Sequence, residues 1–359
     1  MNKINIYLIL LSTKYILLNL FIVSIFIFFL NFIEISRILE TENNNFLIYL
    51  KLSMLKIPTI LDDIIPFVII IGITFLFRNL INNNELISLR NIGLSIFDIF
   101  IPIALCVFII GLIFLLLINP ISSNFENKFQ NIVNKKDINN YSIKISNNEM
   151  WIKNNLDKDN KSFISIENID LQKMIARNIK ILRVNDNSNI LIQAEKGIFD
   201  KKNFALENVG YFDVNREFYK ELDKFNLSIN FNKQNILNSI TDYKLIPFYK
   251  YYDHTITLKK FNLYSSEIGL FYISELLKPM FLIVLTFVVV GYSGKYKRNE
   301  NFFKILFISI LIGFLIFLFK EIITILTISL SLNFFVSYTI IFFLPLLIGL
   351  YLIIKIEND

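Results

Sequence analysis

Six long apolar stretches constrain the fold of this chain more than any other feature of its sequence. They are residues 15–35, 64–80, 97–118, 271–292, 302–319 and 334–354. A helix needs about 20 apolar residues to cross a hydrocarbon core roughly 30 Å thick, and each stretch meets or approaches that length. The chain is also 54% hydrophobic, above the roughly 45–50% of soluble domains. The sequence therefore predicts an integral membrane protein with six transmembrane helices.

The six stretches form two groups of three, separated by a polar segment rich in Asn and Lys. Runs such as SIKIS (142–146) and SFISI (162–166) alternate apolar and polar residues within it, and Asn, Asp and Gly bound them. Period-two alternation with frequent turns is typical of antiparallel strands. We expect helices one to three in 1–121, an inserted antiparallel β domain of jelly-roll type in 122–265, and helices four to six in 266–359.

Basic residues in the short loops predict the orientation of the chain, because cytoplasmic loops carry an excess of Lys and Arg. The loops that share one side of a six-span chain contain Arg78, Arg90, Lys295, Lys297, Arg298 and Lys304. Both termini lie on that same side. We expect cytoplasmic termini and a β domain on the outer, periplasmic side of a bacterial inner membrane.

Composition and missing motifs argue against several classes of function. The net charge of +6 is mild, and no basic cluster is interleaved with the aromatic platforms that bind single-stranded nucleic acid. Cys106 and His254 are each the only residue of their type, so a zinc site or a catalytic triad lacks partners. No G-x-x-x-x-G-K-[ST] phosphate loop occurs. We expect a non-catalytic chain without metal or cofactor, driven by a separate ATPase if ATP is used.

The segment NNNELISLRNIGLS, residues 82–95, predicts a short helix between the second and third spans. Asn84 is a candidate N-cap, and Gly93 can adopt the left-handed conformation that ends a helix. Ser95 and Asp98 have the spacing of a capping box for the next helix. A simple turn would need none of these signals.

The two faces of this short helix differ in polarity. On a helical wheel, Glu85, Ser88 and Asn91 share one side, and the other side carries Leu86, Leu89 and Gly93. An interfacial helix resting on lipid headgroups fits this pattern. A docking helix that presents an acid and a leucine edge to a cytoplasmic partner fits it equally well.

The same segment resembles the signature E-L-x-A-L-R-x-x-G-x-S of the LptF/LptG permease family. It departs from that signature in having Ser88 where the family has Ala. The resemblance continues through EMWIK (149–153) and IQAEKGIFDKKNFALENVGYFD (192–213), which are similar to strands of the family's periplasmic domain. The terminal KIEND resembles the ending of LptG-type members, so an LptG-like chain is expected and the paralogous LptF type is the alternative.

The resemblance implies a permease subunit of an ABC exporter for lipopolysaccharide. Its implied partners are an LptB-like ATPase dimer, an LptF-like permease, an LptC-like periplasmic protein, lipopolysaccharide and membrane lipids. The helix at about 83–93 is then the coupling helix that docks on the ATPase. The implied coupling residues are Glu85, Leu86, Leu89, Arg90 and Gly93. A membrane-anchored scaffold or sensor with an extracytoplasmic β domain is the alternative from another class.

Two further groups of residues are candidate contacts for lipopolysaccharide. Basic residues near the outer ends of the spans can receive anionic phosphates or can snorkel and form local ion pairs; these are Arg37, Lys278 and Lys320. In the β domain, candidates for lining a path for acyl chains are Trp151, Ile164, Ile166, Ile190 and Ile192. The same five residues also fit an ordinary β-domain core, with Trp151 as its anchor.

Overall fold

A computed structural model shows the fold of this chain. It describes residues 3–39, 46–133, 141–146, 149–155, 161–170, 174–185, 188–200, 203–213, 218–229, 243–260, 264–295 and 300–358. Lys297 and Arg298, named above for orientation, lie outside the described residues. The chain divides into two compact units, which are described separately: Met1–Phe129 with Leu270–Asp359, and Gln130–Gly269.

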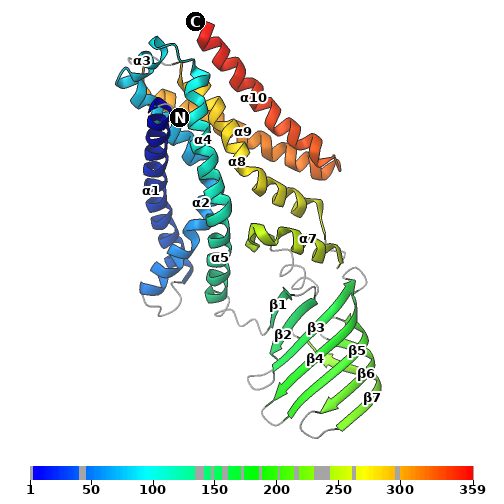
Figure 1. Cartoon of the computed structure of the whole chain (residues 1–359). Coiled ribbons are helices and arrows are strands. Elements are labelled where there is room, and N and C mark those ends of the chain that lie inside the picture. The colour runs from blue at the N-terminus through cyan, green and yellow to red at the C-terminus, as the bar shows by residue number, and fades with distance from the viewer. Residues whose placement is uncertain are drawn as a thin grey trace. The chain divides into compact units, whose positions relative to one another are not determined.

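Six helices in the described residues are long and apolar enough to cross a membrane, which confirms the six-span prediction (Figure 1). Five spans are single helices: α1 (Lys3–Leu39), α2 (Phe46–Asn82), α8 (Ser266–Ser293), α9 (Phe302–Ser329) and α10 (Phe334–Asn358). The third span consists of α4 (Ile96–Ile113), a π-helical turn (Phe114–Ile118) and α5 (Asn119–Val133).

The helices extend well beyond the apolar stretches that predicted them. α2, for example, begins at Phe46, whereas its apolar stretch begins at residue 64. A helix satisfies its backbone hydrogen bonds internally, so polar turns can continue it past the membrane-buried part. α2 also contains Pro58 and Pro66, which are tolerated in spans because neighbouring helices satisfy the freed backbone groups.

Small residues and buried polar contacts bring the spans close together. A Cβ added to Gly111 in α4 would lie 2.8 Å from the Cα of Pro279 in α8. On α1, the Asn19 side chain donates a hydrogen bond of 2.7 Å to the Val68 carbonyl of α2. Small residues at helix crossings and interhelical hydrogen bonds are the usual means of association in a bilayer, where lipid removes the hydrophobic driving force between helices.

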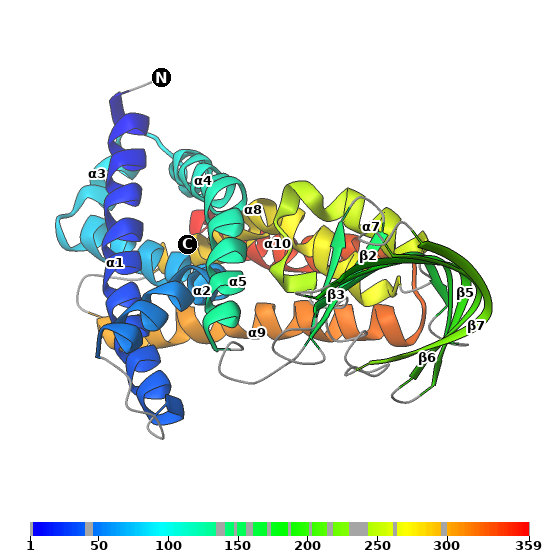
Figure 2. The same cartoon turned by 90° about the horizontal axis from the view of Figure 1, so that it is seen from below.

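The inserted unit contains a seven-stranded antiparallel sheet, which confirms the predicted insertion of antiparallel β structure between the two groups of helices. Its strands are β1 (Tyr141–Ser146), β2 (Glu149–Asn155), β3 (Lys161–Asp170), β4 (Ile175–Asn185), β5 (Ser188–Asp200), β6 (Asn203–Asp213) and β7 (Phe218–Ser228). Their order in the sheet is their order in the chain. The described strands therefore form one meander, and Figure 2 shows that this sheet is strongly curved.

A polar row crosses the middle of the curved sheet. Asn178 in β4 and Asn208 in β6 have left-handed backbones, each with φ of 53°. Their side chains donate hydrogen bonds of 2.9 Å to Glu167 and Glu195 on the neighbouring strands. The strand register places these four residues in one row across β3, β4, β5 and β6. Asn adopts this conformation more readily than most residues, so the row marks where the strands depart from regular geometry.

Short helical elements follow the strands in the described residues of the same unit. Two 3₁₀ turns, Tyr243–Leu245 and Phe248–Lys250, lead into α7 (Tyr251–Lys260). His254 of α7 is half-buried, and burial lowers its pKa to about 4. It is therefore uncharged near neutral pH.

Candidate functional site

The short helix α3 (Glu85–Asn91) forms where the sequence predicts it, between α2 and α4. Asn84 occupies the N-cap position but makes no side-chain cap, which differs from the expectation. Its backbone is left-handed, with φ of 58°, and its carbonyl accepts a 3.1 Å hydrogen bond from the Ser88 amide. The backbone turn therefore does what the side chain was expected to do.

The end of α3 confirms the role predicted for Gly93. This residue has φ of 96°. The Gly93 amide donates to the Arg90 carbonyl at 2.9 Å, and the Leu94 amide donates to the Leu89 carbonyl at 3.2 Å. This pair of bonds is a Schellman motif, which satisfies carbonyls left free at a helix end.

The predicted capping box at the start of α4 is also present. The Asp98 amide donates to Ser95 Oγ at 3.0 Å, and the Ser95 amide donates to Asp98 Oδ2 at 2.9 Å. A helix stop and a helix start thus follow each other directly. The connection between α3 and α4 is fixed by hydrogen bonds on both sides.

Burial divides α3 into an inner and an outer face. Leu86 and Leu89 are 5% and 8% exposed and lie in the hydrophobic cluster that also contains Leu80 of α2. The leucine edge expected to face a partner therefore packs into this chain instead, because it is the apolar face that anchors α3 to the spans. The exposed apolar residues of this segment are Ile87 and Ile92, at 58% and 71% exposed. The helical wheel did not predict that these two residues would be exposed.

Two side chains connect the polar face of α3 to other helices. Tyr7 Oη of α1 donates a 2.7 Å hydrogen bond to Glu85 Oε2. Asn83 Nδ2 approaches Glu85 Oε1 at 3.4 Å. Arg90 Nη2 lies 3.5 Å from the Ile356 carbonyl of α10, at the long limit for a hydrogen bond. Glu85 and Arg90 thus link α3 to the first and the last span.

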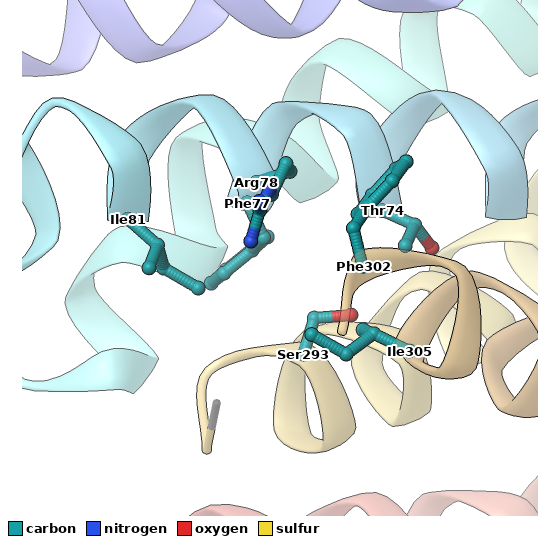
Figure 3. Close-up of a pocket in the computed structure, with 7 residues that line it drawn as sticks. All are labelled: Thr74, Phe77, Arg78, Ile81, Ser293, Phe302 and Ile305. Atoms are coloured by element: carbon teal, nitrogen blue, oxygen red, sulfur yellow. The ribbon is translucent and has the colours of Figure 1, made fainter. Parts of the chain in front are cut away.

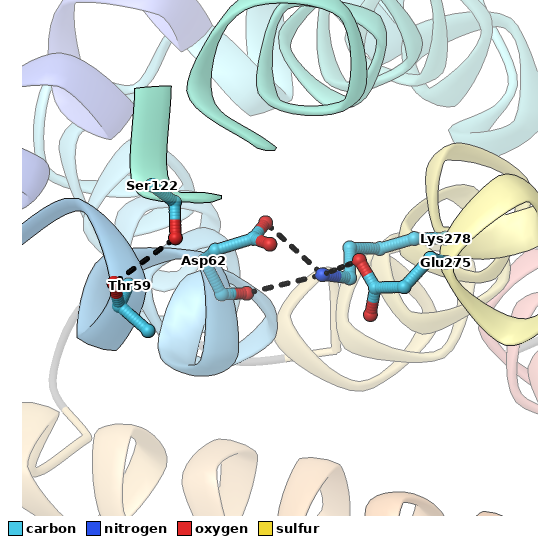
Figure 4. A network of polar contacts seen from close by, with 5 residues as sticks. All are labelled: Thr59, Asp62, Ser122, Glu275 and Lys278. Atoms are coloured by element: carbon cyan, nitrogen blue, oxygen red, sulfur yellow. Dashed lines mark hydrogen bonds and ion pairs between the residues drawn. The ribbon is translucent and has the colours of Figure 1, made fainter. Parts of the chain in front are cut away.

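A buried ion network joins α2 and α8 (Figure 4). Lys278 Nζ lies 3.0 Å from Asp62 Oδ1 and 2.6 Å from Glu275 Oε2, and these side chains are only 11–12% exposed. The sequence placed Glu275 and Lys278 one turn apart, but it did not single out Asp62. The available signal was a pair of Asp residues directly before the apolar stretch of α2 that begins at residue 64. Charges among apolar helices are costly unless they are paired, and Lys278 is paired twice.

The three basic candidates for substrate contact differ in their surroundings. Lys278 already binds two carboxylates, so a phosphate would have to compete with them. Lys320 of α9 forms no ion pair within the described residues, and its Nζ lies 5.3 Å from the Phe281 ring centroid and 5.9 Å from that of Phe317. Arg37 is exposed near the end of α1. Phe281 lies one turn after Lys278 on α8, which places the two lysines in one region.

The β-domain candidates lie on both faces of the sheet. Ile164, Ile166 and Ile192 are fully buried, and Ile190 shares their face by strand alternation but is partly exposed. Trp151 is 43% exposed, so the expectation that it anchors the core is wrong. Its neighbours Met150 and Ile152 in β2 are buried, and alternation turns the residue between them to the opposite face.

A comparison of the sequence with models of known protein families identifies the family of this chain. The model for the lipopolysaccharide export system permease LptF/LptG matches residues 6–355, nearly the whole length. The chain belongs to the LptF/LptG family. A search of curated proteins found no match. The resemblance seen in the sequence is confirmed, and family membership with six apolar helices indicates a multi-pass inner-membrane permease component of lipopolysaccharide export.

The LptF/LptG permease also contains a small cavity between α2, α8 and α9 (Figure 3). It is lined by Thr74, Phe77, Arg78, Ile81, Ser293, Phe302 and Ile305. Arg78 Nη1 and Ser293 Oγ are buried there and have no hydrogen-bond partner among the residues that the structure describes. Buried polar atoms of this kind are commonly satisfied by ordered water, and the cavity has room for about one molecule.

Proposed function

We propose that this chain is the LptG-type permease subunit of an ABC exporter that extracts lipopolysaccharide from the inner membrane and passes it to a periplasmic bridge. The family match, the six spans and the inserted β sheet support this proposal. ATP hydrolysis would take place on a separate LptB-like ATPase dimer, and the termini and α3 would be cytoplasmic. An LptF-like permease and an LptC-like protein would complete the assembly.

The geometry of α3 carries the coupling part of the proposal. Its buried leucines anchor it to the spans, backbone hydrogen bonds hold its two ends, and its outer side carries Glu85 together with the exposed Ile87 and Ile92. No Lys or Arg within the described part of the chain lies within ion-pair distance of Glu85. A basic side chain of the ATPase is the partner that fits a partly exposed carboxylate with no cation of the described residues beside it.

Substitution of Glu85 tests this function directly. We expect Glu85→Lys to abolish most co-purification of the ATPase, because it places two like charges opposite each other. Glu357→Lys, an exposed acid of α10 that we also place on the cytoplasmic side, is the matched control and should retain the ATPase. Equal ATPase recovery and equal lipopolysaccharide export in both variants would contradict the coupling role.

For the substrate, we propose that lipopolysaccharide phosphates bind near Lys320 and Lys278. Lys320 is the stronger candidate, because its ammonium group is held by aromatic rings rather than by a carboxylate. Arg37 remains a candidate at the end of α1. In the β domain, the face that carries Ile164, Ile190 and Ile192 supports an acyl-chain path better than the face that carries Trp151.

A further inference from the structure

The Glu85 carboxylate is held by a residue far away in the sequence. Tyr7, near the start of α1, is 78 positions from Glu85, and its hydroxyl donates to the carboxylate the shortest hydrogen bond that it accepts from the described residues, at 2.7 Å. The contact with Asn83 is longer, at 3.4 Å. The sequence motif predicts a role for the acid but contains no signal for this tyrosine.

The Tyr7–Glu85 bond is not needed to hold the helices together. α1 is already attached to α2 by the buried Asn19 hydrogen bond and by the close approach of Ile16 to Gly72. α3 is already attached through its buried leucines and its caps. Tyr7 is exposed and Glu85 is partly exposed, so water can take the place of the tyrosine hydroxyl if this bond is broken. What this bond does fix is the direction in which the carboxylate points.

We propose that Tyr7 is a positioning residue for Glu85, whose hydroxyl holds the carboxylate in the orientation that binds a basic side chain of the cytoplasmic ATPase. The inference rests on the proposed coupling role of α3. A carboxylate offers about four acceptor sites, so the tyrosine occupies one and leaves the others for a guanidinium or an ammonium. A side chain that is already ordered loses less conformational entropy on binding, which strengthens the complex.

Removal of the single hydroxyl tests the proposal with little disturbance to the fold. In the full-length permease, we expect Tyr7→Phe to weaken binding of the purified ATPase about three- to tenfold, the effect of one net hydrogen bond. The thermal unfolding temperature should stay unchanged. Tyr219→Phe is the matched control, because Tyr219 donates a similar 3.0 Å hydrogen bond to Glu221 in the β sheet. It should leave the affinity unaltered.

A double-mutant cycle separates positioning from a general effect on the helix. In a Glu85→Ala background, Tyr7→Phe should cause no further loss of affinity, because the hydroxyl acts only through the carboxylate. An equal loss in both backgrounds, or unchanged or tighter binding by Tyr7→Phe alone, would overturn the positioning role. If Glu85→Ala itself leaves the affinity unchanged, the proposed coupling function fails instead, so the two failures are distinguishable.

Discussion

Lys278 shows how a single charge is accommodated inside an apolar bundle. Its ammonium group lies between two carboxylates from different helices, and the group of three is more tolerable than any one of its members alone. Neither the pairing nor its geometry follows from sequence, because Asp62 is 216 positions away from Lys278. Glu275, at a spacing of three on the same helix, is the partner that sequence can predict.

Replacement of Lys278 should be far more harmful than replacement of Lys320. We expect Lys278→Met to destabilise the protein by about 3–5 kcal/mol, because it leaves two buried carboxylates without a cation. Lys320→Met removes no ion pair in the described residues and should change stability much less. Thermal unfolding in detergent measures both, and similar losses in the two variants would contradict this account of the network.

Crosslinking to a lipopolysaccharide probe gives Lys320→Met a second readout. The variant should crosslink less than the wild type while it stays folded, because it loses the lysine that is not paired with a carboxylate in the described residues. Crosslinking equal to that of the wild type would leave Lys320 with only its packing against the two phenylalanine rings.

At the scale of elements, the predictable features are those that depend on neighbouring residues. The Gly93 stop, the Ser95–Asp98 capping box and the alternation of the strands are local, and the structure contains all three. The mistaken expectations concern what lies opposite an element. The sequence shows that the leucine face of α3 is apolar, but it does not show whether the chain's own spans or a partner cover that face. The expectation that Trp151 is buried rests on the size of its side chain, whereas the alternation of β2 puts it on the face opposite to Met150 and Ile152.

Helix packing between α4 and α8 provides a test at this same scale. Gly111→Val should destabilise the bundle by about 1–3 kcal/mol, the usual range for overpacking, because even one Cβ would approach the Pro279 backbone too closely. Leu105→Val, which places valine at an exposed position of the same helix, is the control. Unfolding temperatures that match in the two variants would show that the helices can separate without cost.

At the scale of the whole molecule, the spans are covered unequally. In the most apolar part of each span, 61% of the residues are buried within this chain in α2, but only 22% in α1 and in α9. Lipid can cover such surfaces, and in the proposed assembly a second permease would cover part of them.

We expect this chain to form a one-to-one pair with an LptF-type permease when the two are produced together. Native mass spectrometry of the detergent-solubilised complex measures the ratio. An LptG-type permease, produced in the same way, is the control and should not pair. Pairing with the LptG type alone would reassign this chain to the LptF type, and exclusive homodimers would contradict the proposed assembly.

The short connections around α3 have a mechanical consequence. Two residues separate α3 from α2 and four separate it from α4, and hydrogen bonds hold the turns on both sides. No slack chain is left to absorb a displacement. A force applied to this seven-residue helix would therefore pass to the ends of the second and third spans more directly than it would through a flexible loop of equal length.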